Sequence, residues 1–85
     1  MSQRIYVSNL PVNIANEAVA EKFAKFGIVY SAKVITEKKL ESTTGVAFVE
    51  MAFSEDAEKA ISNLNESFFG GRLIRVSDDK KSLLH

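Results

Sequence analysis

The sequence predicts an α+β fold, in which two helices pack on one face of a four-stranded antiparallel sheet. Three observations support this fold class. Four segments have the composition or the period-two alternation of strands, two segments carry apolar residues at helical spacing, and together they follow the order βαββαβ. With both helices on one face, the other face of the sheet, called here the open face, is exposed to solvent.

The first strand and the first helix come early in the chain. Residues 4–10 (RIYVSNL) alternate between polar and apolar side chains, which indicates a half-buried strand. Residues 16–26 carry apolar side chains at helical spacing, at Val19, Phe23 and Phe26. Gly27 stands where a helix stop is expected. The N-cap is either Asn16 or Asn13, since both have a suitable side chain.

Two further strands and a loop occupy the middle of the chain. Residues 28–36 (IVYSAKVIT) are apolar and rich in β-branched side chains, as expected of a strand. Residues 37–44 are polar and predict a loop. Residues 46–53 (VAFVEMAF) predict the third strand.

A second helix and a last strand complete the fold. Ser54 is the expected N-cap, and an apolar stripe follows it at Ala57, Ala60, Ile61 and Leu64. Gly70 and Gly71 mark a turn, because no phosphate-binding glycine spacing surrounds them. Residues 72–77 (RLIRVS) alternate as a fourth strand. Two βαβ halves joined in this way form the ferredoxin-like fold.

Length and composition limit the function classes. A chain of 85 residues holds one domain, and its 11 basic and 11 acidic residues cancel, so overall charge gives no argument for a nucleic-acid partner. With no cysteine and only the terminal His85, we expect no metal, no cofactor and no enzyme activity. No stretch approaches the roughly 18 apolar residues of a membrane span, and no signal peptide is recognisable. We therefore expect a soluble protein of the cytoplasm.

Strand parity assigns side chains to the two faces of the sheet. The residues expected to face the core are Ile5, Val7, Ala32, Val34, Ala47, Val49, Met51, Ile74 and Val76. The residues expected on the open face are Arg4, Tyr6, Ser8, Lys33, Ile35, Val46, Phe48, Glu50, Leu73, Arg75 and Ser77. The open face thus carries three cations against one acid.

Tyr6 and Phe48 become neighbours on the open face if the first and third strands pair. An aromatic pair surrounded by Arg4, Lys33 and Arg75 suits single-stranded nucleic acid, because bases stack on rings at ~1–3 kcal/mol each while cations contact phosphates. The alternative is a cross-strand pair that only stabilises the sheet, by ~0.2–1 kcal/mol. Stacking is favoured, because two paired aromatics on a solvent face expose apolar area without structural gain.

The chain resembles the RNA-recognition motif (RRM) family. Residues 5–10 (IYVSNL) are similar to the hexamer signature of the family and residues 44–51 (TGVAFVEM) to its octamer. The resemblance covers residues 4–78 and implies that Tyr6 and Phe48 each stack a base or a sugar. It also implies an RRM domain over residues 1–79 with a short C-terminal tail at 80–85. Among RRM proteins, the length most resembles the small single-motif proteins of bacteria. The alternative is an isolated domain of a larger protein, which would look the same.

The chain departs from the octamer pattern at three positions. Val46 replaces a third aromatic, and Thr44 replaces a basic residue, so we expect weaker binding than a full motif gives. Met51 replaces an aromatic that parity turns inward, where methionine is a tolerable core residue.

Several polar residues are weaker candidates for nucleic-acid contacts. Lys38 and Lys39 lie in the loop after the second strand, where the alternative is an ordinary solvated loop. Lys80 and Lys81 either reach over the bases or belong to a frayed terminus. Ser8 and Ser77 can bond base edges from the open face.

We therefore predict a module that binds single-stranded RNA, and also single-stranded DNA, because stacking alone does not distinguish the sugars. The alternative is a module of the same fold that binds a protein or a second copy of itself. Val46, Ile35 and Leu73 favour this alternative, because they make the open face more aliphatic.

Overall fold

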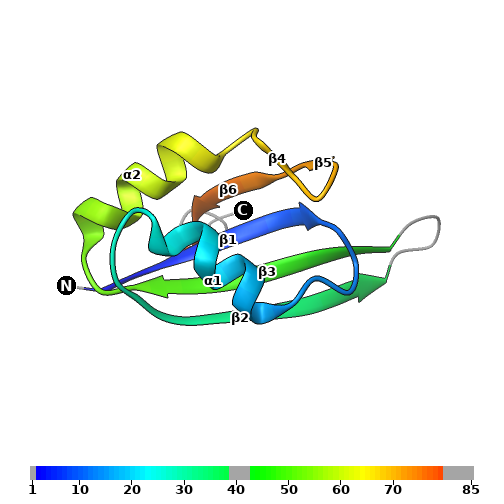
Figure 1. The fold of residues 1–85 in the computed structure, drawn as a ribbon, viewed down its shortest axis with the longest axis horizontal. Helices are drawn as coiled ribbons and strands as arrows, with labels where there is room; N and C mark the ends of the chain where they lie inside the picture. Colours follow the sequence, from blue (N-terminus) through cyan, green and yellow to red (C-terminus); the bar gives the residue numbers. More distant parts are fainter. Residues whose placement is uncertain (1, 39–42, 80–85) are drawn as a thin grey trace.

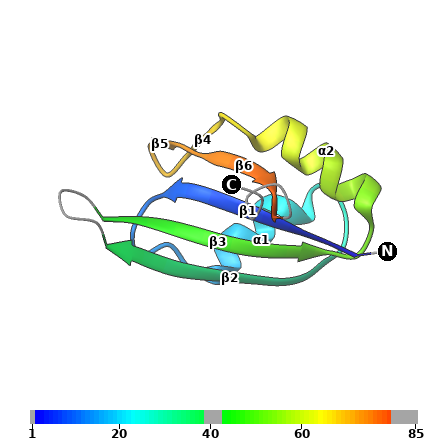
Figure 2. The same cartoon turned by 180° about the vertical axis from the view of Figure 1, so that it is seen from behind.

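The computed structural model describes residues 2–38 and 43–79, which form a four-stranded sheet, a short hairpin and two helices. The elements are β1 (Gln3–Leu10), α1 (Asn16–Ala24), β2 (Val29–Lys38), β3 (Thr43–Met51), α2 (Ser54–Leu64), β4 (Phe68–Phe69), β5 (Arg72–Leu73) and β6 (Arg75–Asp78). The main sheet has the order β2-β3-β1-β6, and all of its neighbours are antiparallel. Both helices lie on one face (Figure 1), and the view from behind shows no helix on the other (Figure 2). The predicted α+β class and the ferredoxin-like order are confirmed.

The core lies between the helices and the sheet. The strands supply fully buried side chains at Ile5, Val7, Ala47, Val49 and Met51, with Val76 nearly so, and Ile74 between β5 and β6 is also fully buried. Helix α1 contributes Val19 and Phe23, and α2 contributes Ala57, Ala60 and Leu64. Ala32, Val34 and Ile61 pack partly buried against this cluster. The inward half of the parity assignment is therefore confirmed for all four strands.

The loop predicted at residues 37–44 is wrong at both ends, because β2 continues to Lys38 and β3 begins at Thr43. The ladder runs on through the pairs Glu37↔Thr44 and Lys38↔Thr43. The polar composition of these residues suggested a loop. Paired strands that extend beyond the core can, however, satisfy their backbone hydrogen bonds without burying side chains.

The predicted fourth strand is split in two. Arg72–Leu73 pairs with Phe68–Phe69 as a small hairpin, and Arg75–Asp78 pairs with β1. The turn of this hairpin is Gly70–Gly71, with φ of 60° and 83°. Two consecutive positive φ angles are typical of a two-residue type I′ hairpin turn, so the prediction of a turn here is confirmed.

A bulge interrupts β1 next to the open face. Val7 pairs with Ala47 but Leu10 pairs with Gly45, so two residues, Ser8 and Asn9, stand opposite Val46. Asn9 has φ of 62°, in the left-handed region that asparagine tolerates. The extra residue turns Leu10 into the core, where it is fully buried.

The expected helix caps are wrong. The N-cap of α1 is Ala15 and that of α2 is Phe53, and neither makes a side-chain cap bond. The Oδ1 atom of Asn16 instead accepts a hydrogen bond from the backbone N–H of Val34, at 2.8 Å. Near the end of α2, the Oδ1 atom of Asn65 accepts one from the N–H of Val76, at 2.9 Å. The two asparagines thus tie the helices to the two outer strands of the sheet.

In the described part of the chain, neither helix has the length and apolar character needed to cross a membrane.

Candidate nucleic-acid interface

The register of the sheet places the predicted side chains in rows across the open face. Tyr6 stands opposite Phe48 on one side and Ser77 on the other, and Phe48 stands opposite Lys33. The next row joins Ser31, Glu50 and Arg4. One further row pairs Ser8 with Arg75. Residues predicted from separate strands therefore meet at the centre of one surface.

Tyr6 and Phe48 form an aromatic pair at the centre of this surface. Their ring centroids are 5.5 Å apart and their planes are inclined by 52°. This is a tilted contact within the range of favourable ring pairs. Both residues are half-buried, so the rings are less exposed than parity alone suggested. Each ring nevertheless keeps part of its surface in contact with solvent, which a stacking base needs.

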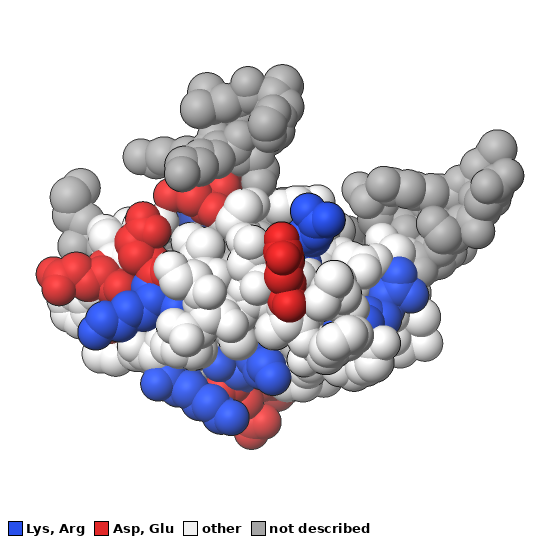
Figure 3. Space-filling model, turned by 90° about the horizontal axis from the view of Figure 1, so that it is seen from above, with Lys and Arg blue, Asp and Glu red and all other residues white. Residues whose placement is uncertain are grey.

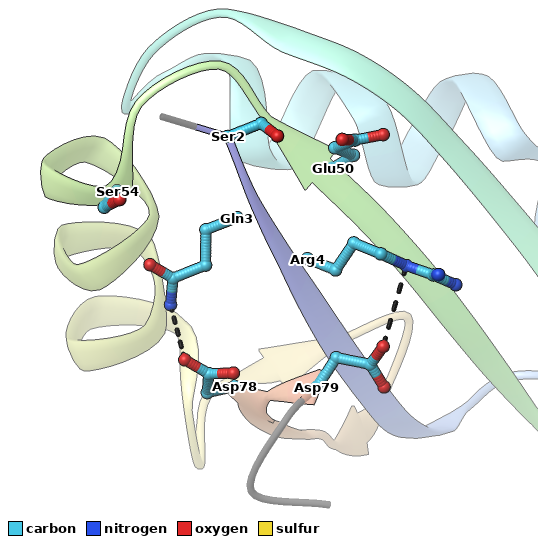
Figure 4. A pocket seen from close by; sticks show the side chains of 7 residues that line it. All are labelled: Ser2, Gln3, Arg4, Glu50, Ser54, Asp78 and Asp79. Carbon is cyan, nitrogen blue, oxygen red and sulfur yellow. Dashed lines mark hydrogen bonds and ion pairs between the residues drawn. The ribbon is translucent and has the colours of Figure 1, made fainter. Parts of the chain in front are cut away.

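Arg4 is engaged on two sides. Its guanidinium carbon lies 5.4 Å from the centroid of the Phe48 ring, a cation–π contact. Its Nε atom forms an ion pair with Oδ2 of Asp79, at 3.6 Å. Figure 4 shows the Arg4 side chain running between Glu50 and Asp79, with the ion pair drawn to Asp79. The Arg4 side chain is 60% exposed, so this pair contributes little to stability and the guanidinium stays accessible to a ligand.

Asp79 was missed by the sequence analysis, which named no site residue between Ser77 and Lys80. The side chain of Asp79 is buried, and Asp78 accepts a hydrogen bond from Nε2 of Gln3, at 2.7 Å. The signal was present in the alternation, because Asp79 has the same parity as Ser77 and Arg75. Counting Asp79 leaves the open face with three cations, Arg4, Lys33 and Arg75, against two acids.

Lys33 and Arg75 are exposed on opposite sides of the aromatic pair, as parity predicts. Ser8 and Ser77 are half-buried on the same face. Charge is also mixed outside this face: Figure 3, which looks down on the molecule at right angles to the view of Figure 1, shows small groups of basic and of acidic side chains separated by uncharged surface. The cations are therefore useful at short range, while long-range attraction of a polyanion is weak.

The expected exposure of Val46 is wrong. Val46 lies between Ile35 of β2 and the bulged residues Ser8 and Asn9 of β1, and only 6% of its surface is exposed. The bulge brings two residues of β1 against one of β3, and parity alone does not reveal such crowding. Ile35 does remain exposed, at 43%. Leu73 is 40% exposed but pairs with Phe68 in the β4–β5 hairpin, so its predicted place in a strand of the main sheet is wrong.

The remaining lysine predictions are mostly outside the described residues. Lys39, Lys80 and Lys81 lie there, and Lys38 is placed by its backbone as the last residue of β2. Within residues 2–38 and 43–79, no three side chains of the metal-binding types come together.

Other aromatic side chains are more exposed than the central pair. Tyr30 is 65% exposed, Phe53 52% and Phe68 71%. Tyr30 falls in a second register shift, between Val29 and Ser31, which strand parity could not have placed.

Comparison with known proteins identifies the arrangement. The family model for the RNA recognition motif matches residues 5–75, which span β1 through the start of β6. A 31 kDa ribonucleoprotein of chloroplasts from Nicotiana sylvestris is 35% identical over 74 residues, which cover 87% of this chain and 24% of the relative. The small ribosomal subunit protein cS22 of Arabidopsis thaliana is 38% identical over 74 residues, covering 87% of this chain and 29% of the relative.

The chain thus spans about a quarter of the length of these relatives. They are plant proteins and give no support to the resemblance with small bacterial proteins.

Solved structures agree in fold and in order of elements. The RNA-binding protein PG1 superposes with a TM-score of 0.78 at 36% identity, covering 89% of this chain and 92% of that one. The Sxl-lethal protein, whose structure is a complex with RNA, has a TM-score of 0.74 at 33% identity and covers 88% of this chain and 46% of its own.

Proposed function

The chain belongs to the RNA recognition motif family, and from this premise we propose that its open face binds single-stranded RNA. The observation that carries the proposal is the Tyr6–Phe48 pair, held in register at the centre of the face with partly exposed rings. Relatives named as ribonucleoproteins and a structural neighbour solved with RNA support it. The proposed activity is binding, without a chemical step.

In this mechanism the rings and the cations have separate tasks. One base stacks on Phe48 and the next on Tyr6, each contributing ~1–3 kcal/mol. Lys33 and Arg75 contact phosphates on either side of the pair, and each phosphate contact adds ~0.7 to the salt slope of a single strand. Arg4 contributes less than a free cation would, because Asp79 neutralises it.

The direct test is a titration of the full chain with a short fluorescent RNA of random sequence, against the same RNA annealed to its complement. We expect micromolar binding of the single strand that weakens as salt is raised, and much weaker binding of the duplex, whose bases are not available for stacking. Equal affinity for both forms would contradict stacking. A deoxyribose strand of the same sequence is expected to bind comparably, since no described contact depends on a 2′-hydroxyl.

A second candidate function is self-association or binding of a protein through the same face. The exposure of Ile35 favours it, while Val46 is buried and Leu73 belongs to the separate β4–β5 hairpin, so two of the three aliphatic residues on which it depended no longer support it. Sedimentation of the chain across a concentration series distinguishes the two. A mass that stays monomeric, together with RNA binding, supports the first function over the second. A location in the cytoplasm stays a prediction, and so does the division into a domain over residues 1–79 and a tail.

A further inference from the structure

A hollow of about 380 Å³ lies on the open face beside Phe48. It is lined by Arg4, Ser31, Lys33, Ile35, Phe48 and Glu50, which come from β1, β2 and β3. This volume falls within the range of small-ligand sites. The lining combines a ring, two cations and a single carboxylate, so the hollow offers different chemistry along its length.

Glu50 is the unusual member of this lining. Within residues 2–38 and 43–79 its carboxylate makes no hydrogen bond or ion pair. Its cross-strand partner Arg4 pairs with Asp79 instead, as Figure 4 shows. Glu50 is half-buried and lines this hollow on the open face. An ionised carboxylate is an acceptor only, and here it retains its acceptor capacity for a ligand.

The spacing between Glu50 and Phe48 suits one nucleobase. The two residues are two apart on β3 and therefore lie on the same face, separated by ~7 Å along the strand. A base stacked on the Phe48 ring can consequently present one edge to the Glu50 carboxylate. The phosphates would lie toward Lys33, which stands directly opposite Phe48 on β2, because the carboxylate repels them.

The four bases differ in what they offer an acceptor-only group. The Watson–Crick edge of guanine presents two adjacent donors, N1–H and N2–H, which match the two oxygens of a carboxylate. Cytosine and adenine present one amino donor beside an acceptor nitrogen. Uracil presents one N3–H between two carbonyl oxygens, which a carboxylate repels. A bidentate side-chain pairing with a base discriminates by about 5- to 150-fold.

We propose that Glu50 makes the hollow beside Phe48 a guanine site, in which the base stacks on the ring and its N1–H and N2–H donate to the carboxylate. The inference rests on the proposed RNA binding and adds a base preference to it. Glu50 would act as a specificity-determining residue in direct contact with the base.

The test uses four RNA pentamers, a pentauridine and its variants with G, A or C at the central position. Because the flanks are uniform, the strand can slide until the variable base enters the hollow. Affinities are measured by fluorescence anisotropy at fixed salt for the wild type and for Glu50→Gln. The matched control is Glu58→Gln, which makes the same charge change at an exposed position of α2, on the helix side of the sheet.

For the wild type we expect the G pentamer to bind about tenfold more tightly than the U pentamer, with A and C between them. In Glu50→Gln the G preference should fall to about twofold or less, while pentauridine binding is unchanged or improved because an acid has been removed. Glu58→Gln should keep the wild-type ratio. Equal binding of all four pentamers by the wild type, or a G preference that persists in Glu50→Gln, overturns the guanine site and leaves RNA binding intact. Failure of every pentamer to bind overturns both.

Discussion

Replacing Phe48 by alanine separates stacking from folding. On the binding side, the substitution removes one platform, worth ~1–3 kcal/mol, so affinity for single-stranded RNA should fall about 5- to 150-fold. On the folding side, it removes the contact with Tyr6 at 5.5 Å, worth ~0.5–1.5 kcal/mol, and the contact with Arg4 at 5.4 Å, worth ~0.5–1 kcal/mol. Loss of the buried half of the ring adds about 1 kcal/mol.

The folding cost therefore sums to about 2–3.5 kcal/mol, against a stability of ~5–15 kcal/mol for a typical domain. The variant should fold and melt at a lower temperature, by ~4–8 °C for each kcal/mol. The assay is a pair of measurements on each protein: an anisotropy titration with one short RNA at fixed low salt, well below the melting temperature, and a thermal melt followed by circular dichroism.

Tyr6→Ala is measured in parallel, and Tyr30→Ala is the matched control. Tyr30 is 65% exposed and lies outside the central row, so its removal should change affinity less than twofold. Affinities within twofold of wild type for both Phe48→Ala and Tyr6→Ala, in folded proteins, would refute stacking on these rings. An equally large loss in Tyr30→Ala would show that the binding surface lies elsewhere.

Three further predictions concern charge and backbone. Lys33→Gln should weaken RNA binding and lower the slope of log affinity against log salt by ~0.7, as a salt series would show; an unchanged slope would mean that Lys33 contacts no phosphate. Asp79→Asn should strengthen binding at low salt and steepen the same slope, because Arg4 is released from its ion pair, and weaker binding would contradict this role. Gly70→Ala should destabilise the domain by about 1 kcal/mol or more, as a urea titration would measure. The reason is that φ of Gly70 is 60° and the added Cβ would lie 2.7 Å from Cγ of Pro11. A stability equal to that of the wild type would show that the hairpin adjusts freely.

Much of this structure could be predicted from periodicity. The order of elements, the inward-facing residues of the four strands and the pairing of Tyr6 with Phe48 follow from alternation with period two and from helical spacing. These features depend on which side chains avoid water, which is the property that the sequence pattern records.

The features that escaped prediction depend on backbone irregularity or on partners distant in sequence. A single extra residue at Ser8–Asn9 buries Val46, and nothing in the local pattern marks that residue as extra. The Arg4–Asp79 pair joins the first strand to residues just beyond the last, so it becomes visible only when β1 and β6 are placed side by side. Asn16 and Asn65 are of a residue type that caps helices, but their side chains accept hydrogen bonds from backbone N–H groups of two strands that are distant in sequence.

The bonds made by these two asparagines bear on how the protein behaves in concentrated solution. β2 and β6 are the outer strands, and each points a backbone N–H, that of Val34 or Val76, away from its neighbour in the sheet. Such donors on an outer strand are a template on which another chain can add a strand and begin an aggregate. Here one backbone N–H on each outer strand already donates a hydrogen bond to a side-chain amide oxygen. The two bonds therefore oppose the addition of a further strand at these positions and leave the open face uncovered, where the proposed RNA would bind.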